Sequence, residues 1–357
     1  MNMTRLLVLA AALLGAGTSS SEAGQPLSMW QVNGPQSRVY LLGSIHLLRK
    51  KDYPLPAAIY DAYRDADKLV MELDMDDMDP VEGQALSNEL GLIQDDRNLS
   101  DLMGADLYAQ AKQLALAAQI PIGLLDRSEP WYAAMNVEIM LLIRMGFNPL
   151  YGIEKHLADM AQADGKEILG FETMRQQLQF LDGLSPDAQR ELLIQALSEG
   201  VELPEIMDSM IGAWRSGDVK FLEENLLADM QKYPELNRVI VIDRNIEWTR
   251  RIEELLDDDL DYLIVVGTLH LVGEEGVPKL LEARGHQVTQ MVDRQESARE
   301  RSNGVHWQAN SLQPSQISTI SKSSFPAPQS GQRQDSGTSF QRVRGGIPDS
   351  TSPSSSL

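Results

Sequence analysis

The hydrophobic positions near the start of the chain form short runs that alternate with one amphipathic stretch. Trp30 to Val32 and Arg38 to Gly43 are β-type runs on either side of an Asn-Gly pair, which predicts a hairpin. Residues 56–67 carry apolar side chains four positions apart, as one face of a helix requires. Residues 68–74 then form an apolar run that turns acidic at its end. Strand, helix and strand in this order predict an α/β fold.

The rest of the pattern extends this prediction. Residues 84–235 are mostly helical in periodicity, with one expected buried strand at 167–172. The pattern then returns to α/β, with a helix over 239–256, a continuous apolar strand over 261–267, a short helix over 277–283 and a last strand over 287–292. We therefore expect a central sheet with a large helical middle region inserted into it.

The two ends of the chain differ from this body. Residues 1–23 contain a basic Arg5, a nine-residue apolar segment and a small-x-small site, the pattern of a cleaved export signal. The alternative is a buried N-terminal helix. From residue 295 to 357 the chain is rich in Ser, Gln, Pro and Gly, which predicts a disordered tail. The expected folded domain is 24–294 of a periplasmic or secreted bacterial protein. No later apolar stretch is long enough to predict a membrane anchor.

Charge and cysteine content exclude several classes of function. The 357 residues carry 31 Lys+Arg against 52 Asp+Glu, a formal net charge of −21, and no Cys. This acidity argues against nucleic acid as a partner, because phosphates need a basic surface. It favours a cation or a basic peptide. Without Cys, a metal could be bound only by imidazoles and carboxylates, a ligand set that suits Mn, Co or Zn.

One motif occurs twice, 224 residues apart. Val39–Leu48 and Leu263–Val272 both run from an apolar strand into Gly-[Ser/Thr]-[Ile/Leu]-His, and the two histidines are His46 and His270. The repetition predicts a central sheet built from two pseudo-repeated halves, each ending in a GxxH motif. Ligands of open α/β sheets bind at the carboxyl ends of strands, so we expect both histidines in one site. The alternative is a pair of histidines that only cap strand ends.

A carboxylate would complete such a site. Two imidazoles and one carboxylate can hold a divalent ion and leave a position open for water. Glu72 is the best candidate, since it ends a strand within one α/β unit of His46. The alternative is an exposed acid on a strand edge, which is our interpretation of Asp74 and Asp76.

The paired GxxH motifs and the strand-terminal glutamate resemble the TraB/PrgY/GumN family, which includes the TIKI ectoproteases and is related to erythromycin-esterase and ChaN-like proteins. The resemblance covers roughly 29–293 and is greatest to bacterial GumN-like members. Its other carriers are the stretches 66–72, 151–157, 165–173, Arg244-Asn245 and 267–281. It implies a metal-dependent hydrolase that acts on a peptide or protein, with a divalent ion as cofactor.

The resemblance also implies roles for individual residues. By similarity, the metal ligands are His46, His270, Glu72 and Glu154, and the catalytic residues are Glu72, Arg244 and Glu172. Glu72 would serve as ligand or as base. Arg244 would stabilise an oxyanion or hold a substrate carboxylate. Its alternative role is a structural ion pair with Glu154 or Glu172.

Three functions remain open at this point. The first is an exported metallohydrolase, a peptidase by resemblance. The second is an esterase-like hydrolase that uses His46 as a metal-free general base. The third is a non-catalytic binding protein of the cell envelope, with the helical middle region as its docking surface.

Overall fold

The structure is a computed structural model, and it describes residues 24–74, 79–199, 203–230 and 232–293. The chain divides into two units, Met1–Glu296 and Ser297–Leu357, and every described residue belongs to the first. The expected export signal and the whole of the expected tail lie outside the described residues, so both stay predictions. Within the described part, no helix combines the length and the apolar character needed to cross a membrane.

A six-stranded mixed sheet forms the centre of the described unit, in the order β4-β3-β5-β2-β1-β6. Its strands are β1 (Gln25–Asn33), β2 (Arg38–Ser44), β3 (Lys68–Leu73), β4 (Ile168–Glu172), β5 (Tyr262–Gly267) and β6 (Val288–Asp293). The first two form the predicted antiparallel hairpin, and β6 adds to β1 antiparallel as well. Strands β2, β5, β3 and β4 are mutually parallel. Their carboxyl ends therefore lie along one edge of the sheet.

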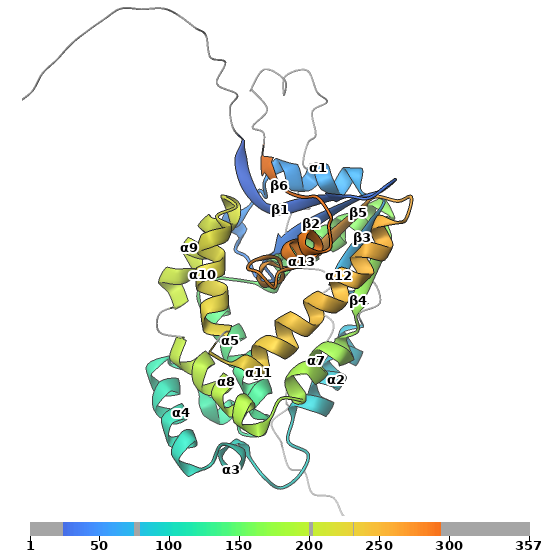
Figure 1. Cartoon of the computed structure of the whole chain (residues 1–357). Helices are drawn as coiled ribbons and strands as arrows, with labels where there is room; N and C mark the ends of the chain where they lie inside the picture. The colour runs from blue at the N-terminus through green and yellow to red at the C-terminus, as the bar shows by residue number, and fades with distance from the viewer. Residues whose placement is uncertain (1–23, 75–78, 200–202, 231, 294–357) are drawn as a thin grey trace, which may run out of the picture. The chain divides into compact units, whose positions relative to one another are not determined.

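Helices cover both faces of this sheet and extend beyond it (Figure 1). Those on the chain up to β4 are α1 (Ala57–Asp65), α2 (Pro80–Gly91), α3 (Leu99–Met103), α4 (Ala105–Ala117), α5 (Pro130–Arg144) and α6 (Ile153–Asp164). Those after β4 are α7 (Met174–Asp182), α8 (Pro186–Glu199), α9 (Leu203–Arg215), α10 (Val219–Met230), α11 (Pro234–Asn237), α12 (Asp243–Leu256) and α13 (Val277–Ala283). The prediction of an α/β fold with a mostly helical middle region is confirmed.

Alternation along the strands builds one core on each face of the sheet. In β2, Tyr40 and Leu42 belong to the core that packs against α1, α6 and α9, while Val39 and Leu41 belong to the core that packs against α12 and α13. Side chains of a strand point to opposite faces with a period of two, which explains this division. A third core holds α3, α4, α5 and α8 together apart from the sheet.

The segment 239–256, which the sequence predicts to be one α-helix, does not begin as an α-helix. Residues Arg238–Ile242 form a π-helical turn, and regular α12 follows from Asp243. Such π-turns are rare and often occur at functional sites, so the residues immediately after this turn are candidates for a functional role. Arg244 is one of them.

The two GxxH segments lie side by side in the sheet. β2 pairs directly with β5 in parallel register, with Ser44 opposite Gly267. Thr268 Oγ1 donates a hydrogen bond of 2.9 Å to the carbonyl oxygen of Ser44 and so ties the two motifs together. The origin of this arrangement in two pseudo-repeated halves stays a prediction.

Candidate functional site

Four strand ends bring together the residues that the sequence singled out. Glu72 stands one residue before the end of β3, and Glu172 is the last residue of β4. His46 follows β2 by two residues, and His270 lies in a short 3-10 turn, Thr268–Leu271, immediately after β5. All of them therefore lie at the carboxyl edge of the parallel strands, where ligands of such sheets bind.

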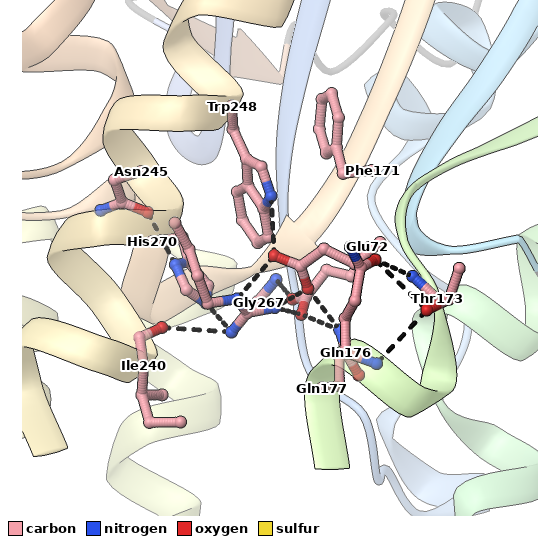
Figure 2. Close-up of polar contacts among 12 residues, drawn as sticks. Glu72, Phe171, Thr173, Gln176, Gln177, Ile240, Asn245, Trp248, Gly267 and His270 are labelled. Atoms are coloured by element: carbon pink, nitrogen blue, oxygen red, sulfur yellow. Dashed lines mark hydrogen bonds and ion pairs between the residues drawn. The ribbon is translucent and has the colours of Figure 1, made fainter. Parts of the chain in front are cut away.

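Arg244 is the centre of this cluster, with a side chain only 8% exposed. Its Nε and Nη2 donate to the two oxygens of Glu172 at 2.9 and 2.8 Å, and Nη2 also donates to Glu72 Oε2 at 2.6 Å. Its Nη1 donates to the carbonyl oxygen of Ile240 and faces Nε2 of His270, both at 3.1 Å. A guanidinium has five N–H groups, and here all five have an acceptor. Three of the residues that accept, Ile240, Glu72 and His270, are labelled in Figure 2.

Glu72 is almost enclosed, yet it is held in its charged form. Its Oε1 accepts the backbone N–H of Gly267 at 2.8 Å, and its Oε2 accepts from Gln177 Nε2 at 3.1 Å as well as from Arg244. Burial alone would raise the pKa of Glu72, but the facing His270, Arg244 and His46 and the Gly267 N–H outweigh burial and lower it to about 2. Glu72 is therefore a carboxylate at neutral pH.

His270 is fixed as a neutral imidazole by its two partners. Its Nδ1 lies 2.7 Å from Oδ1 of Asn245, which only accepts, and its Nε2 faces the guanidinium of Arg244, which only donates. The proton therefore sits on Nδ1 and the lone pair on Nε2. Burial is the main cause that lowers the pKa of His270, to about 3, in agreement with the neutral ring.

His46 forms a second, more open part of the site. Its Nδ1 lies 2.6 Å from Glu154 Oε1, and its side chain is 62% exposed. Ser44 donates a short hydrogen bond to the same carboxylate oxygen. The charge of Glu154 is the largest cause that raises the pKa of His46, to about 9, and burial opposes it only in part. In this structure His46 is a cation at neutral pH with Nδ1 held and Nε2 directed away from Glu154.

The first turn of α6 fixes the geometry of that pair. The Ile153 N–H donates to the carbonyl oxygen of Ile45 at 3.2 Å. Gly152 precedes the helix, and a Cβ at this position would come within 2.2 Å of the carbonyl oxygen of His46. Only glycine therefore lets the helix start lie directly against the histidine loop. Glu154 is then held in the first helical turn, where the helix dipole favours a negative charge.

A gap beside Gly267 joins the two parts of the site. A Cβ on Gly267 would lie 3.3 Å from Glu72 Oε1, 3.6 Å from His46 Nε2 and 3.7 Å from His270 Cδ2. Both imidazoles have Nδ1 bonded to a protein acceptor, which is how proteins orient metal-binding histidines. The donor types around the gap thus fit a divalent ion.

The arrangement is not yet a closed metal centre. Within the described ranges, no three His, Asp or Glu side chains already stand as a metal-binding group. The reason is visible in the contacts, since Arg244 engages both His270 Nε2 and Glu72 Oε2. Metal binding by both histidines would require His270 to exchange Arg244 for the ion.

The structure places the predicted residues in two connected groups. Arg244 pairs with Glu172, as one of the alternatives expected, and with Glu72. Glu154 pairs with His46 through Nδ1, so it supports that ring from behind rather than sharing the gap. The engagement of every Arg244 donor favours a positioning role, while its role toward an oxyanion stays a prediction.

Sequence reasoning gave no role to three side chains that hold this cluster. Trp248 Nε1 donates to Glu172 Oε1 at 3.0 Å, Gln177 Nε2 donates to both Glu172 and Glu72, and Asn245 orients His270. The helical spacing was the available signal for Trp248, which lies one turn after Arg244. Nothing in the local pattern marks Gln177, because its partners come from two other segments.

Comparisons with known proteins identify the family of this chain. "Uncharacterized protein YbaP" of Escherichia coli strain K12 is 23% identical over 242 residues, covering 68% of this chain and 87% of that protein. The protein of the same name from Shigella flexneri matches to the same extent. An "Uncharacterized protein" of Treponema pallidum strain Nichols is 23% identical over 171 residues, 48% of this chain and 51% of its own length. No solved structure matches. The sequence profile of the TraB/PrgY/gumN family matches residues 28–290, and the chain therefore belongs to this family.

Proposed function

We propose that this protein is an exported hydrolase that uses a divalent metal ion at the carboxyl edge of its sheet, with a peptide as substrate. The ion would be held by His46 and His270, with Glu72 as third ligand or as base. Mn, Co or Zn suits this set of imidazole and carboxylate donors.

The observation that carries the proposal is the charge of the cluster. Glu72, Glu154 and Glu172 have side chains 12%, 13% and 8% exposed, and Arg244 is the one guanidinium among them. With His46 protonated and His270 neutral, the cluster keeps one negative charge without a counter-charge, and it keeps two once His46 releases its proton to bind a metal. Enclosed carboxylates are costly unless cations compensate them, and a divalent ion would compensate both charges.

The residues of the chain divide the work as follows. When bound, a divalent ion acidifies water and polarises a carbonyl group. Glu72 takes a proton from water and returns it to the leaving amine in the base role. Glu172 accepts two hydrogen bonds from Arg244 and holds its guanidinium in place. Arg244 in turn fixes the orientation of Glu72. Glu154 and Asn245 hold Nδ1 of His46 and of His270, so that His46 Nε2 borders the gap beside Gly267 while His270 Nε2 faces Arg244 until an ion replaces it.

A second candidate, a metal-free hydrolase, is favoured by one specific contact. His46 with Glu154 behind it and Nε2 free is an acid–base group oriented by a third residue. Arg244 then serves as the cation of the site. With a pKa of about 9, His46 would start as an acid at neutral pH, and as a base only in alkaline solution.

Metal analysis of the purified protein separates these candidates. We expect about one equivalent of bound metal per chain in the wild type and a loss of most of it in the His46→Ala/His270→Ala double variant. His286→Ala is the matched control, because His286 contacts Glu253 away from the site. Equal, negligible metal in wild type and double variant would overturn the metallohydrolase. Hydrolysis that persists without metal but ends in His46→Ala would support the second candidate.

Export is tested separately by fractionation of cells that produce the full chain. We expect the mature protein outside the cytosol with residues 1–23 removed, as its N-terminal sequence would show. A full-length protein in the cytosol would contradict this part of the proposal.

A further inference from the structure

A cleft of about 600 Å³ opens directly beside the candidate site. Its walls come from the end of β4, from α7, and from the π-turn and first turns of α12. Glu172 and Arg244 belong to both the cleft lining and the polar cluster. A molecule in the cleft would therefore be separated from Glu72 by the guanidinium of Arg244. Nη2 of this guanidinium donates to Glu72 at 2.6 Å.

Charged groups of this lining are already engaged within the protein. Arg251 donates to the backbone carbonyls of Phe171 and Gly170. Arg250 pairs with Glu247 and Glu254, two acids of its own helix. These charged side chains already have partners within the protein. They are therefore less available to bind a charged ligand.

Two of the apolar side chains in the lining, Phe180 and Val239, are only half-buried and offer surface to a ligand, whereas Phe171 and Trp248 lie in the hydrophobic core. Phe180 comes from α7 and Val239 from the π-turn. Phe171 and Trp248 are stacked with ring centroids 5.3 Å apart, and Figure 2 shows both above the polar cluster. The guanidinium carbon of Arg244 lies 4.6 Å from the Trp248 ring and 5.6 Å from the Phe180 ring. An aromatic or aliphatic side chain could contact Phe180 and Val239 without breaking a hydrogen bond.

We infer that this cleft is a substrate subsite that receives a bulky apolar or aromatic side chain of a peptide, next to the position where the chain would be cut. The volume falls in the range of small-molecule pockets, and the apolar side chains of the lining would meet the substrate side chain next to the fixed polar groups. That the bound molecule is a substrate rests on the proposed function. The preference of the cleft for an apolar side chain can be measured without any reaction.

The test uses three small probes on the metal-free full chain. They are the N-acetyl amides of phenylalanine, alanine and lysine, and their binding is followed by NMR titration. We expect the phenylalanine probe to bind at least about tenfold more tightly than the other two, as apolar pockets discriminate. Phe180→Ala should weaken its binding about fivefold to tenfold, because the variant removes one aromatic wall.

A matched pair of variants then locates the binding. Val239→Trp fills the cleft and should abolish binding of the phenylalanine probe. Ile246→Trp introduces the same residue on α12 at a position that is 48% exposed and outside the cleft lining, and it should bind the probe like the wild type. Circular dichroism and thermal unfolding check that each variant folds.

The outcomes separate the subsite from the proposed chemistry. Equal binding of the three probes, or undiminished binding in folded Val239→Trp, would overturn the subsite even if the protein is a metallohydrolase. Binding with the expected preference in a protein that holds no metal and cleaves no peptide would keep the apolar subsite and overturn the proposed reaction.

Discussion

Gly267 is the residue on which the shape of the candidate site depends most directly. It ends β5 at φ −51° and ψ 136°, a conformation that alanine adopts without strain. The absence of a side chain is therefore needed for space and not for the backbone. That space is the gap bordered by His46 Nε2, Glu72 Oε1 and the His270 ring.

Gly267→Ala should accordingly damage the site while leaving the fold intact. The new methyl group would press on Glu72 Oε1 at 3.3 Å and occupy the gap. We expect metal affinity to fall at least about tenfold, or about 1.4 kcal/mol. The free energy of unfolding should change by less than about 1 kcal/mol. Isothermal titration with Mn²⁺ and urea unfolding measure the two effects, and unchanged metal affinity would show that the ion does not bind in this gap.

The charge state of His46 gives a second prediction at this scale. NMR titration of the metal-free protein should find the pKa of His46 raised to about 9, chiefly by the charge of Glu154. In Glu154→Gln it should fall back toward the ordinary value of about 6.5. Because the folded pKa is the higher one, the pair stabilises the fold fully below about pH 6.5 and loses that effect as the pH rises through about 9. A pKa that Glu154→Gln does not change would contradict the contact.

Sequence alone could identify the site histidines because the same motif delivers both. It offered Glu172 as one possible partner of Arg244 but could not identify the full set of five acceptor atoms, since they belong to β3, β4, the π-turn and the turn after β5. These segments are distant in sequence and meet only when the sheet forms. The same reason kept Gln177 out of the prediction, although it bridges Glu72 and Glu172.

Elements were predicted more completely than contacts. The hairpin, the strand that carries Glu72 and the fully buried β5 follow from periodicity and a turn signal, both of which are local properties. The π-turn at Arg238–Ile242 did not follow, since a π-turn and an α-turn share the same apolar pattern. It carries Ile240, whose carbonyl oxygen accepts from Arg244, and so fixes the guanidinium from its own helix.

Helix α9 is hydrogen-bonded to the end of β2, the strand that precedes His46. This hydrogen bond can be tested by itself. Trp214 is 2% exposed, and its Nε1 donates to the carbonyl oxygen of Gly43 at 2.7 Å. Trp214→Phe keeps an aromatic ring but leaves this carbonyl short of a partner. We expect a loss of about 1–3 kcal/mol in the free energy of unfolding, measured by urea titration.

The same Trp-to-Phe substitution at Trp131 is a control for the loss of side-chain volume. It is fully buried, and in the part of the chain that the structure describes its Nε1 has no hydrogen-bond partner. Trp131→Phe therefore loses volume without losing a hydrogen bond. A destabilisation in Trp131→Phe as large as that in Trp214→Phe would assign the whole effect to packing.

At the scale of the whole molecule, the candidate site joins both halves of the chain. His46 and Glu72 come from the first 72 residues, whereas Arg244 and His270 come from the far side of the helical middle region. An ion held by His46 and His270 would crosslink two parallel strands that are 224 residues apart in sequence. Ion binding should therefore be linked to global unfolding rather than to a local loop.

This linkage gives a prediction that needs no substrate. A ligand that binds only the folded state stabilises it by about 2.7 kcal/mol at a free concentration of about 100 times its Kd. Thermal unfolding of chelator-treated protein should shift upward on addition of Mn²⁺, Co²⁺ or Zn²⁺, and His286→Ala should respond like the wild type. His46→Ala/His270→Ala should show no shift, because removing both imidazoles removes the crosslink. An equal shift in the double variant would place the ion elsewhere on this acidic chain, and the charge of the cluster would then need another counter-ion.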